Sequence, residues 1–337
     1  MNGLKFSAIA IGVGLVVMAF AAWLGLDYFY FAGYTILQYI VLATAWNILG
    51  GYCGYVNFGS AAFFAMGAYS SVALHKFDGE IDTWFPDNIA PLLHAIFPLP
   101  IPILILFGGI VSGIAGLGMG YLTLRLRGSF FAIATLALAV VLQTLVVNWD
   151  FVGGSRGAYI IRPETIVIAG FEINYIIYLF VLMLILAVIA LTTARAIERS
   201  QLGFGFATIR DDELAAEASG VPTLRLKLIA TTLSGAFMGM AGAPFPYYIG
   251  YLQPASAFSL DYAVNSIAMP MIGGTTSWIG PLVGSVLLGS LQQIATVTIS
   301  SAVNLLIVGI LLVTFVIIAP NGLVGLTQEH WRKRRRP

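Results

Sequence analysis

The sequence predicts an all-α protein, a polytopic transmembrane bundle of about eight to ten helices in a single domain that covers residues 1–337. Three observations support this prediction. Hydrophobic residues make up 59% of the chain and charged residues only 9%, whereas a soluble domain carries about 25% charged residues. The mean hydropathy is +0.92. Apolar stretches of roughly 20 residues, the length that crosses a bilayer, recur along the whole chain.

Ten segments are long and apolar enough to be candidate spans. In chain order they cover residues 6–26, 29–49, 57–75, 99–122, 129–148, 174–195, 225–249, 258–276, 280–299 and 301–319. The third and the eighth are interrupted by Gly, Ser, Asn or Pro, so a broken or re-entrant helix is the alternative at both places. The first follows Lys5 and resembles a signal peptide, but its apolar run continues to Leu26, so we expect a retained span.

Lysine and arginine gather on one side of this topology, which sets the expected orientation. With the N-terminus inside, the cytoplasmic side receives Lys5, Arg125, Arg127, Arg195, Arg199, Arg210, Arg225, Lys227 and the tail, and the outer side receives Lys76, Arg156 and Arg162. We therefore expect both termini in the cytoplasm. The basic tail, residues 327–337, is expected to contact membrane lipid, with partner recruitment as the alternative and no nucleic-acid binding. Outer loops at 76–98 and 149–173 are either solvated or a docking face for an external protein.

The longest polar interval without a candidate span covers residues 196–224 and lies on the cytoplasmic side. It contains a stretch rich in Ala and Glu that predicts one short helix from Thr208 to Ser219. Gly220 and Pro222 end this helix, since both are common helix stop signals. A short capped helix between two spans is suited to docking in a groove of a soluble partner.

Two Gly-rich and aromatic-rich stretches, 50–69 and 238–284, occupy the two halves of the chain. In many transporters interrupted segments at corresponding places flank the substrate path, whereas tight helix packing is the equal alternative. The polar residues expected along such a path are Asn57, Ser60, Tyr69, Gln143, Asn265, Ser266, Thr275, Gln292 and Gln293.

Ionisable and catalytic groups are scarce inside the spans. Asp261 is the only plausible acid for a proton relay, and we expect it instead to complement the dipole of a helix N-terminus. The sequence contains no P-loop and no His-Glu-x-x-His motif. A single cysteine, Cys53, and three scattered histidines, His75, His94 and His330, indicate no disulfide and no metal site. We therefore expect no enzyme, no catalytic residue and no bound cofactor or metal.

Several separated motifs resemble one family, the permease subunits of ABC importers for branched-chain amino acids, and among them the longer of the two paired permeases. The motifs are Trp46–Tyr52 (WNILGGY), Phe58–Phe64 (FGSAAFF), Arg127–Ile133 (RGSFFAI), Val152–Ser155 (VGGS), Ile209–Asp211 (IRD), Gly239–Gly242 (GMAG), Gly273–Gly274, Trp278–Pro281 (WIGP) and Pro320–Leu323 (PNGL). Their order and spacing cover nearly the whole chain.

The resemblance implies a subunit of the inner membrane that pairs with a second, similar permease. It also implies two cytoplasmic ATPase subunits, which bind the ATP, and an external solute-binding protein. Ala216 and Gly220 match the Ala-x-x-x-Gly loop that fits a cleft in the ATPase. Arg210, Asp211, Asp212 and Glu213 flank that loop and are expected to set its register by charge.

The sequence departs from the family where a Gly-Gln-x-Ser run is common and this chain has Gly54–Gly59 (GYVNFG). Tyr247, Tyr248 and Tyr251 add aromatic surface. Branched-chain amino acids remain the first expectation for the cargo, with urea, short amides or aromatic acids as alternatives. From other classes, a secondary transporter or channel that works alone, or a membrane scaffold without transport, also fits the composition.

Overall fold

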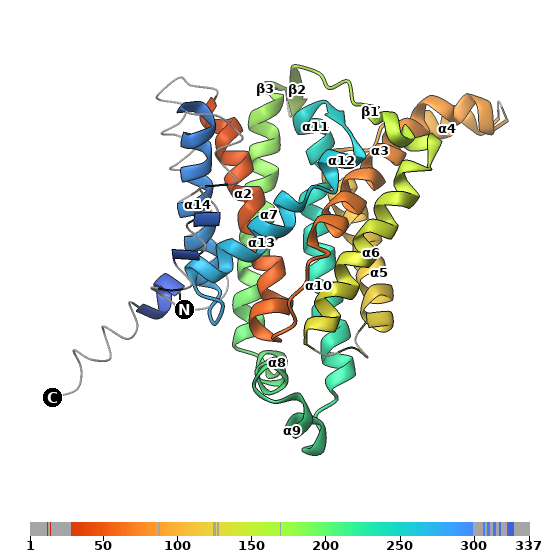
Figure 1. Ribbon diagram of the computed structural model, residues 1–337. Coiled ribbons are helices and arrows are strands. Elements are labelled where there is room, and N and C mark those ends of the chain that lie inside the picture. The colour runs from red at the N-terminus through yellow and green to blue at the C-terminus, as the bar shows by residue number, and fades with distance from the viewer. Residues whose placement is uncertain are drawn as a thin grey trace.

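A computed structural model describes residues 28–298 apart from residues 87, 124–125, 127 and 169, together with the isolated positions 12, 14, 306, 309–310, 313–314, 317 and 322–326. Helices dominate the described part, as the composition predicts (Figure 1). The longer helices are α2 (Tyr28–Asn47), α3 (Ser60–Trp84), α5 (Ile101–Thr123), α6 (Ser129–Val147), α7 (Tyr175–Glu198), α8 (Gln201–Asp211), α10 (Thr223–Gly242), α13 (Leu260–Gly273) and α14 (Ile279–Thr298). The candidate spans at 6–26 and 301–319 and the tail at 327–337 lie outside the described residues, isolated positions aside.

Six helical segments of the described part are long and apolar enough to cross a membrane. They are Tyr28–Tyr52, Ile101–Thr123, Ser129–Val147, Tyr175–Glu198, Thr223–Ile249 and Ile279–Val297. Each coincides with a predicted span to within a few residues. The first continues from α2 through a π-helix, η1 (Ile48–Tyr52).

The two segments predicted to be weak spans differ from the other six. Helix α3 is 25 residues long but contains several charged residues near its C-terminal end. It continues to Trp84, so residues 76–84 of the predicted outer loop are helical. Helix α13 has 14 residues, about 21 Å of helix at 1.5 Å per residue. Because the hydrocarbon core is about 30 Å thick, α13 is too short to cross it. The eighth segment is therefore a short helix and not a clean crossing, as the alternative of a broken or re-entrant helix predicts.

Helix α10 lies at the centre of the bundle and packs against α5, α3 and α2 (Figure 1). Its contact with α5 is lined by small residues four apart: Gly108, Ser112 and Gly116 on α5, and Thr231, Gly235 and Gly239 on α10. Small side chains let two helix backbones approach closely in a membrane. Tight packing, rather than a substrate path, therefore accounts for the glycines at this contact.

The end of the bundle opposite α8 carries short elements that the sequence did not predict (Figure 1). Strand β1 (Ala158–Tyr159) pairs with β4 (Tyr251–Leu252), and β2 (Thr165–Ile168) pairs with β3 (Phe171–Asn174), both antiparallel. The remaining short elements are α4 (Ala90–His94), η2 (Asp150–Val152), η3 (Gly154–Arg156), α11 (Phe245–Ile249) and α12 (Pro254–Ala257). Arg162 donates to the carbonyl oxygens of Tyr247 (2.7 Å) and Tyr248 (2.6 Å), which ties the loop at 149–173 to α11.

His94, at the end of α4, contacts two carboxylates near the C-terminal end of α3. His94 Nε2 lies 3.0 Å from Asp82 Oδ1, and His94 Nδ1 lies 3.5 Å from Asp78 Oδ1. The hydrogen bond to Asp82, followed by the charges of both carboxylates, raises the pKa of His94 above its ordinary value. Because the folded pKa is raised, the ion pair stabilises the packing of α4 against α3 fully below the ordinary histidine pKa of about 6.5. That stabilisation is lost as the pH rises through the raised value.

We expect hydrogen exchange at residues 85–98, corrected for its intrinsic pH dependence, to be faster at pH 9 than at pH 6. The pH-dependent difference should disappear in His94→Gln, since glutamine does not titrate. An equal pH response in the wild type and this variant would contradict the assignment to His94.

Candidate coupling site and translocation path

Helices α8 and α9 (Glu213–Ala218) project beyond the ends of the spans at one end of the molecule (Figure 1). The prediction of one helix from Thr208 to Ser219 is wrong, because Asp212 has extended backbone angles (φ −160°, ψ 106°) and separates them. Its carboxylate accepts a hydrogen bond from the Ala215 amide at 3.0 Å. Aspartate is a preferred N-cap residue, so this interruption starts a second helix.

The predicted end of the helix at Gly220 is confirmed and has a specific geometry. Gly220 has φ +83°, a left-handed conformation that glycine adopts without steric cost. The Val221 amide donates to the Ala216 oxygen, and the Gly220 amide donates to the Glu217 oxygen, both at 3.0 Å. This pair of hydrogen bonds is a Schellman motif. The spacing of Ala216 and Gly220 is therefore also what this helix end requires.

Burial divides five of the predicted coupling residues, Arg210, Asp211, Glu213, Ala216 and Gly220, into two groups. Ala216 is 5% exposed and the Glu213 side chain 13%, so both face the chain's own bundle. Arg210, Asp211 and Gly220 lie on the surface, where Arg210 pairs with Asp211 at 3.2 Å.

A residue that the sequence reasoning missed is Leu214, which is 63% exposed on α9. Ala215 and Ala218 are exposed on the same helix. The sequence shows a leucine two residues after Asp212. Its exposure follows only from the break between α8 and α9 at Asp212. The outward surface of α9 is small and apolar, with charges at its edge.

Four of the predicted path residues meet at the contact of α2, α3, α13 and α14. Gln292 donates to Asn265 Oδ1 at 2.7 Å, and Asn265 donates to the Tyr39 hydroxyl at 3.5 Å. Nearby, the Ser266 hydroxyl donates to the Ser60 hydroxyl at 2.9 Å. Ser60, Asn265, Ser266 and Gln292 are all buried. They form a neutral polar cluster inside an apolar bundle, which we call the polar cluster.

Three other predicted path residues lie apart from the polar cluster in local roles. The Asn57 side chain accepts a hydrogen bond from the Gly59 amide at 2.7 Å, which shapes the turn before α3. Tyr69 is buried on α3, and its ring stacks with Phe258 at 6.4 Å between centroids. Gln293 lies beside Tyr28, whose hydroxyl donates to the Gln293 side chain at 3.2 Å.

The remaining two predicted path residues, Gln143 on α6 and Thr275 between α13 and α14, are half-buried. Asp261 lies in the first turn of α13, two residues after the N-cap Ser259, as predicted.

The sequence reasoning also missed Asn47, a buried amide at the junction of α2 and η1. It lies against Gly51, where an added Cβ would be 1.9 Å from Asn47 Oδ1. Single π-helical turns often mark functional places in a helix. A polar residue at the end of an apolar span was the signal in the sequence.

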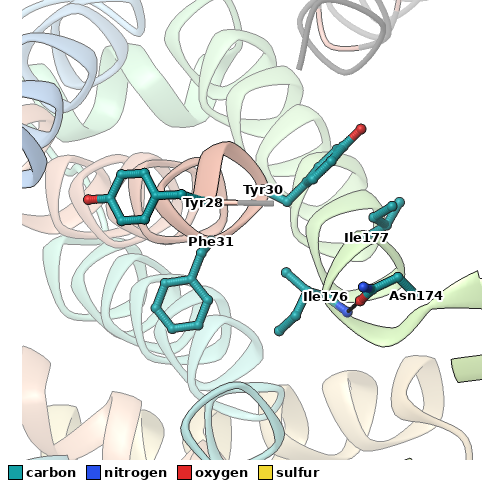
Figure 2. Close-up of a pocket in the computed structure, with 6 residues that line it drawn as sticks. All are labelled: Tyr28, Tyr30, Phe31, Asn174, Ile176 and Ile177. Atoms are coloured by element: carbon teal, nitrogen blue, oxygen red, sulfur yellow. Dashed lines mark hydrogen bonds between the residues drawn. The ribbon is translucent and has the colours of Figure 1, made fainter. Parts of the chain in front are cut away.

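Among the cavities along the described chain, one of about 310 Å³ is lined by Tyr28, Tyr30, Phe31, Asn174, Ile176 and Ile177 at the ends of α2 and α7 (Figure 2). The Asn174 side chain accepts from the Ile176 amide at 2.9 Å (Figure 2), so its oxygen caps α7. The polar cluster takes no part in this cavity.

Two further cavities are larger. One of about 750 Å³ lies between α3, α5 and α6, has mostly apolar walls and includes Tyr69. One of about 670 Å³ lies beside α8 and α9, where Arg210 and Glu213 join Cys53, Tyr55 and Ile133 in its wall. Among the described residues, no group of three or more His, Cys, Asp or Glu side chains could hold a metal ion.

Comparison with known proteins identifies the family. The family described as "Branched-chain amino acid transport system / permease component" matches residues 28–316. The chain belongs to this family. It is therefore an integral membrane protein and a permease subunit of a transport system, as the motifs predict.

Curated relatives include "High-affinity branched-chain amino acid transport system permease protein LivM" from Salmonella typhimurium, 28% identical over 312 residues, which cover 86% of this chain and 68% of the relative. LivM from Escherichia coli is 27% identical with the same coverage. A "Probable branched-chain amino acid transport permease protein LivH" from Methanocaldococcus jannaschii is 24% identical over 83% of this chain and 85% of the relative. No solved structure matches.

Proposed function

We propose that this chain is the permease subunit of an ATP-driven importer of branched-chain amino acids in the cytoplasmic membrane, with both termini in the cytoplasm. It pairs with a second permease, two cytoplasmic ATPase subunits act on the pair, and an external solute-binding protein delivers the cargo. The chain binds no cofactor, and the ATPases bind and hydrolyse ATP. The single observation that carries this proposal is the projecting pair α8 and α9 on a permease-family bundle (Figure 1).

The outward surface of α9 is the proposed docking site for the ATPase. Leu214 is its apolar anchor, since exposed large apolar side chains mark interaction sites when they are grouped with other apolar groups. Arg210 and Asp211 at the end of α8 supply charges of both signs beside it. Ala216 and Glu213 act from the inner side of the same helix by holding it against the bundle.

The cargo assignment draws support from the relatives and from the character of the path. The LivM and LivH relatives are named for branched-chain amino acid transport. The polar cluster contains hydroxyl and amide groups without a charged side chain, which suits weak binding of an amphipathic solute during passage. Tyr247 and Tyr248, two of the residues that suggested an aromatic or amide cargo, are buried in packing contacts: Tyr248 stacks on Tyr34 at 4.1 Å between centroids.

Purification of the tagged chain from its native membrane, followed by reconstitution of the complex with its binding protein, tests the proposal. We expect two ATPases and a second permease to accompany the chain, and leucine uptake to require ATP inside the liposome. Isoleucine and valine should compete with leucine, whereas urea and phenylalanine should not. Asp261→Asn should leave uptake unchanged. ATP-independent uptake by the chain alone, abolished in Asp261→Asn, would instead establish a secondary transporter.

A further inference from the structure

A buried ion pair connects the projecting helix α9 to the bundle. Lys227 Nζ on α10 lies 2.6 Å from Glu213 Oε1 at the start of α9. The Lys227 side chain is only 3% exposed. The hydroxyl of Tyr55, in the segment between η1 and α3, donates to the other oxygen of Glu213. Lys227 also lies 3.3 Å from the Tyr55 hydroxyl and 5.0 Å from the centre of its ring.

These three residues come from segments that are distant along the chain. Tyr55 precedes Glu213 by 158 residues and Lys227 by 172 residues. A buried ion pair contributes little net stability relative to apolar residues of similar volume, and its best-attested role is to specify one arrangement. Removing one partner leaves an uncompensated buried charge, which is strongly unfavourable. The pair therefore favours a single position of α9 against α10 and the Tyr55 segment.

The Tyr55 segment leads directly to the polar side chains at the start of α3. The Trp46 indole donates to the Asn57 carbonyl oxygen at 2.9 Å, and Ser60, which begins α3, bonds to Ser266. On the other side of the contact, Leu214 follows Glu213 directly. One carboxylate, that of Glu213, therefore connects α9 to Tyr55.

We propose that Tyr55, Glu213 and Lys227 form a joint that transmits movement of α9 to the segment 53–59 and so to the polar cluster. They are positioning residues for transport, since none of them needs to touch the cargo or the ATPase. This inference rests on the proposed function, which makes α9 the docking site of an ATPase.

The single cysteine of the chain provides a reporter for the joint. Cys53 lies directly beyond the span Tyr28–Tyr52, is buried, and lines the 670 Å³ cavity together with Tyr55 and Glu213. Burial raises the pKa of the Cys53 thiol to about 12. At pH 8 only about 1 thiol in 10,000 is ionised at that pKa, and the thiolate is the reactive form. We expect Cys53 to react slowly with a maleimide while Glu213 keeps its contacts with Lys227 and Tyr55.

The experiment uses the reconstituted complex with its ATPases and binding protein, and measures leucine uptake per ATP hydrolysed together with the rate of Cys53 labelling. In Glu213→Gln we expect the ATPases to remain bound, uptake per ATP to fall at least tenfold and labelling to become at least tenfold faster. Reversing the charges, Glu213→Lys with Lys227→Glu, should restore part of both. Glu172→Gln, the same change on an exposed outer strand, should behave as the wild type.

Unchanged uptake per ATP in Glu213→Gln would overturn the joint, as would a charge reversal that rescues protein yield but neither uptake nor labelling. If Glu213→Gln does not fold, Tyr55→Phe decides, because it removes one hydroxyl and leaves the ion pair: reduced uptake per ATP supports the joint, and normal uptake overturns it. Failure of the proposed function is distinguishable, since the wild-type chain itself would then lack ATPases or ATP-dependent uptake.

Discussion

Replacing Gly239 with valine is expected to remove nearly all folded protein from the membrane. A Cβ atom at this position would lie 2.2 Å from Ser112 Oγ and 2.5 Å from the Gly108 carbonyl oxygen. Overpacking a well-packed contact costs about 1–3 kcal/mol or more. The cost should lie at or above the top of that range here, because backbone of α5 cannot move aside as a side chain can. Gel filtration of detergent extracts and the Tm of the remaining protein measure the effect.

The matched control is Gly118→Val on α5. Gly118 is exposed, and a Cβ atom added to it would have nothing within 4 Å. The same substitution there should leave yield and Tm close to those of the wild type. Equal losses at the two positions would show that valine disturbs any glycine of these helices, and the close contact of α5 with α10 would not be the cause.

Replacing Leu214 with aspartate is expected to separate the permease from its ATPases. Removing a central apolar anchor of an interface costs about 2 kcal/mol or more, which corresponds to an affinity about 30-fold lower. Because the Leu214 side chain is 63% exposed in this chain alone, the change should not lower the Tm of the permease. Quantitative mass spectrometry of the ATPases that accompany the tagged chain measures the loss.

Two control variants accompany the Leu214→Asp experiment. Leu214→Met keeps an apolar side chain of similar size and should retain the ATPases. Ile161→Asp makes an equivalent change at a residue that is 88% exposed, two positions after strand β1. Strand β1 lies at the opposite end of the bundle (Figure 1), so this variant should also retain them. Retention of the ATPases by Leu214→Asp would place their docking surface elsewhere.

The positions of the spans were predictable because hydropathy is a local property. Segments such as 99–122 and 129–148 became α5 and α6 with nearly the predicted ends. The helix end at Gly220 was predictable for the same reason, since a left-handed residue is a local requirement. The family motifs, read together, were sufficient to predict the permease class that the match over residues 28–316 shows.

The candidate site was predictable only in part. The sequence pointed to Asn265, Ser266 and Ser60 as polar residues in apolar segments, but which of the predicted path residues meet depends on how α3, α13 and α14 pack. Asn57 and Gln143 had the same signal and lie apart from them. Polarity within a span is visible in the sequence, whereas the partner of each polar group is decided by contacts between segments far apart in the chain.

The sequence by itself determined that this protein is a membrane-spanning helical permease with a capped helix on one side, because composition, length and turn residues act locally. Only the tertiary structure decided that the predicted helix breaks at Asp212, that Leu214 faces outward and that Glu213 turns inward to Lys227. The physical reason is that burial of a charge is favourable only beside its partner, and that partner, together with Tyr55, is brought to Glu213 by the fold.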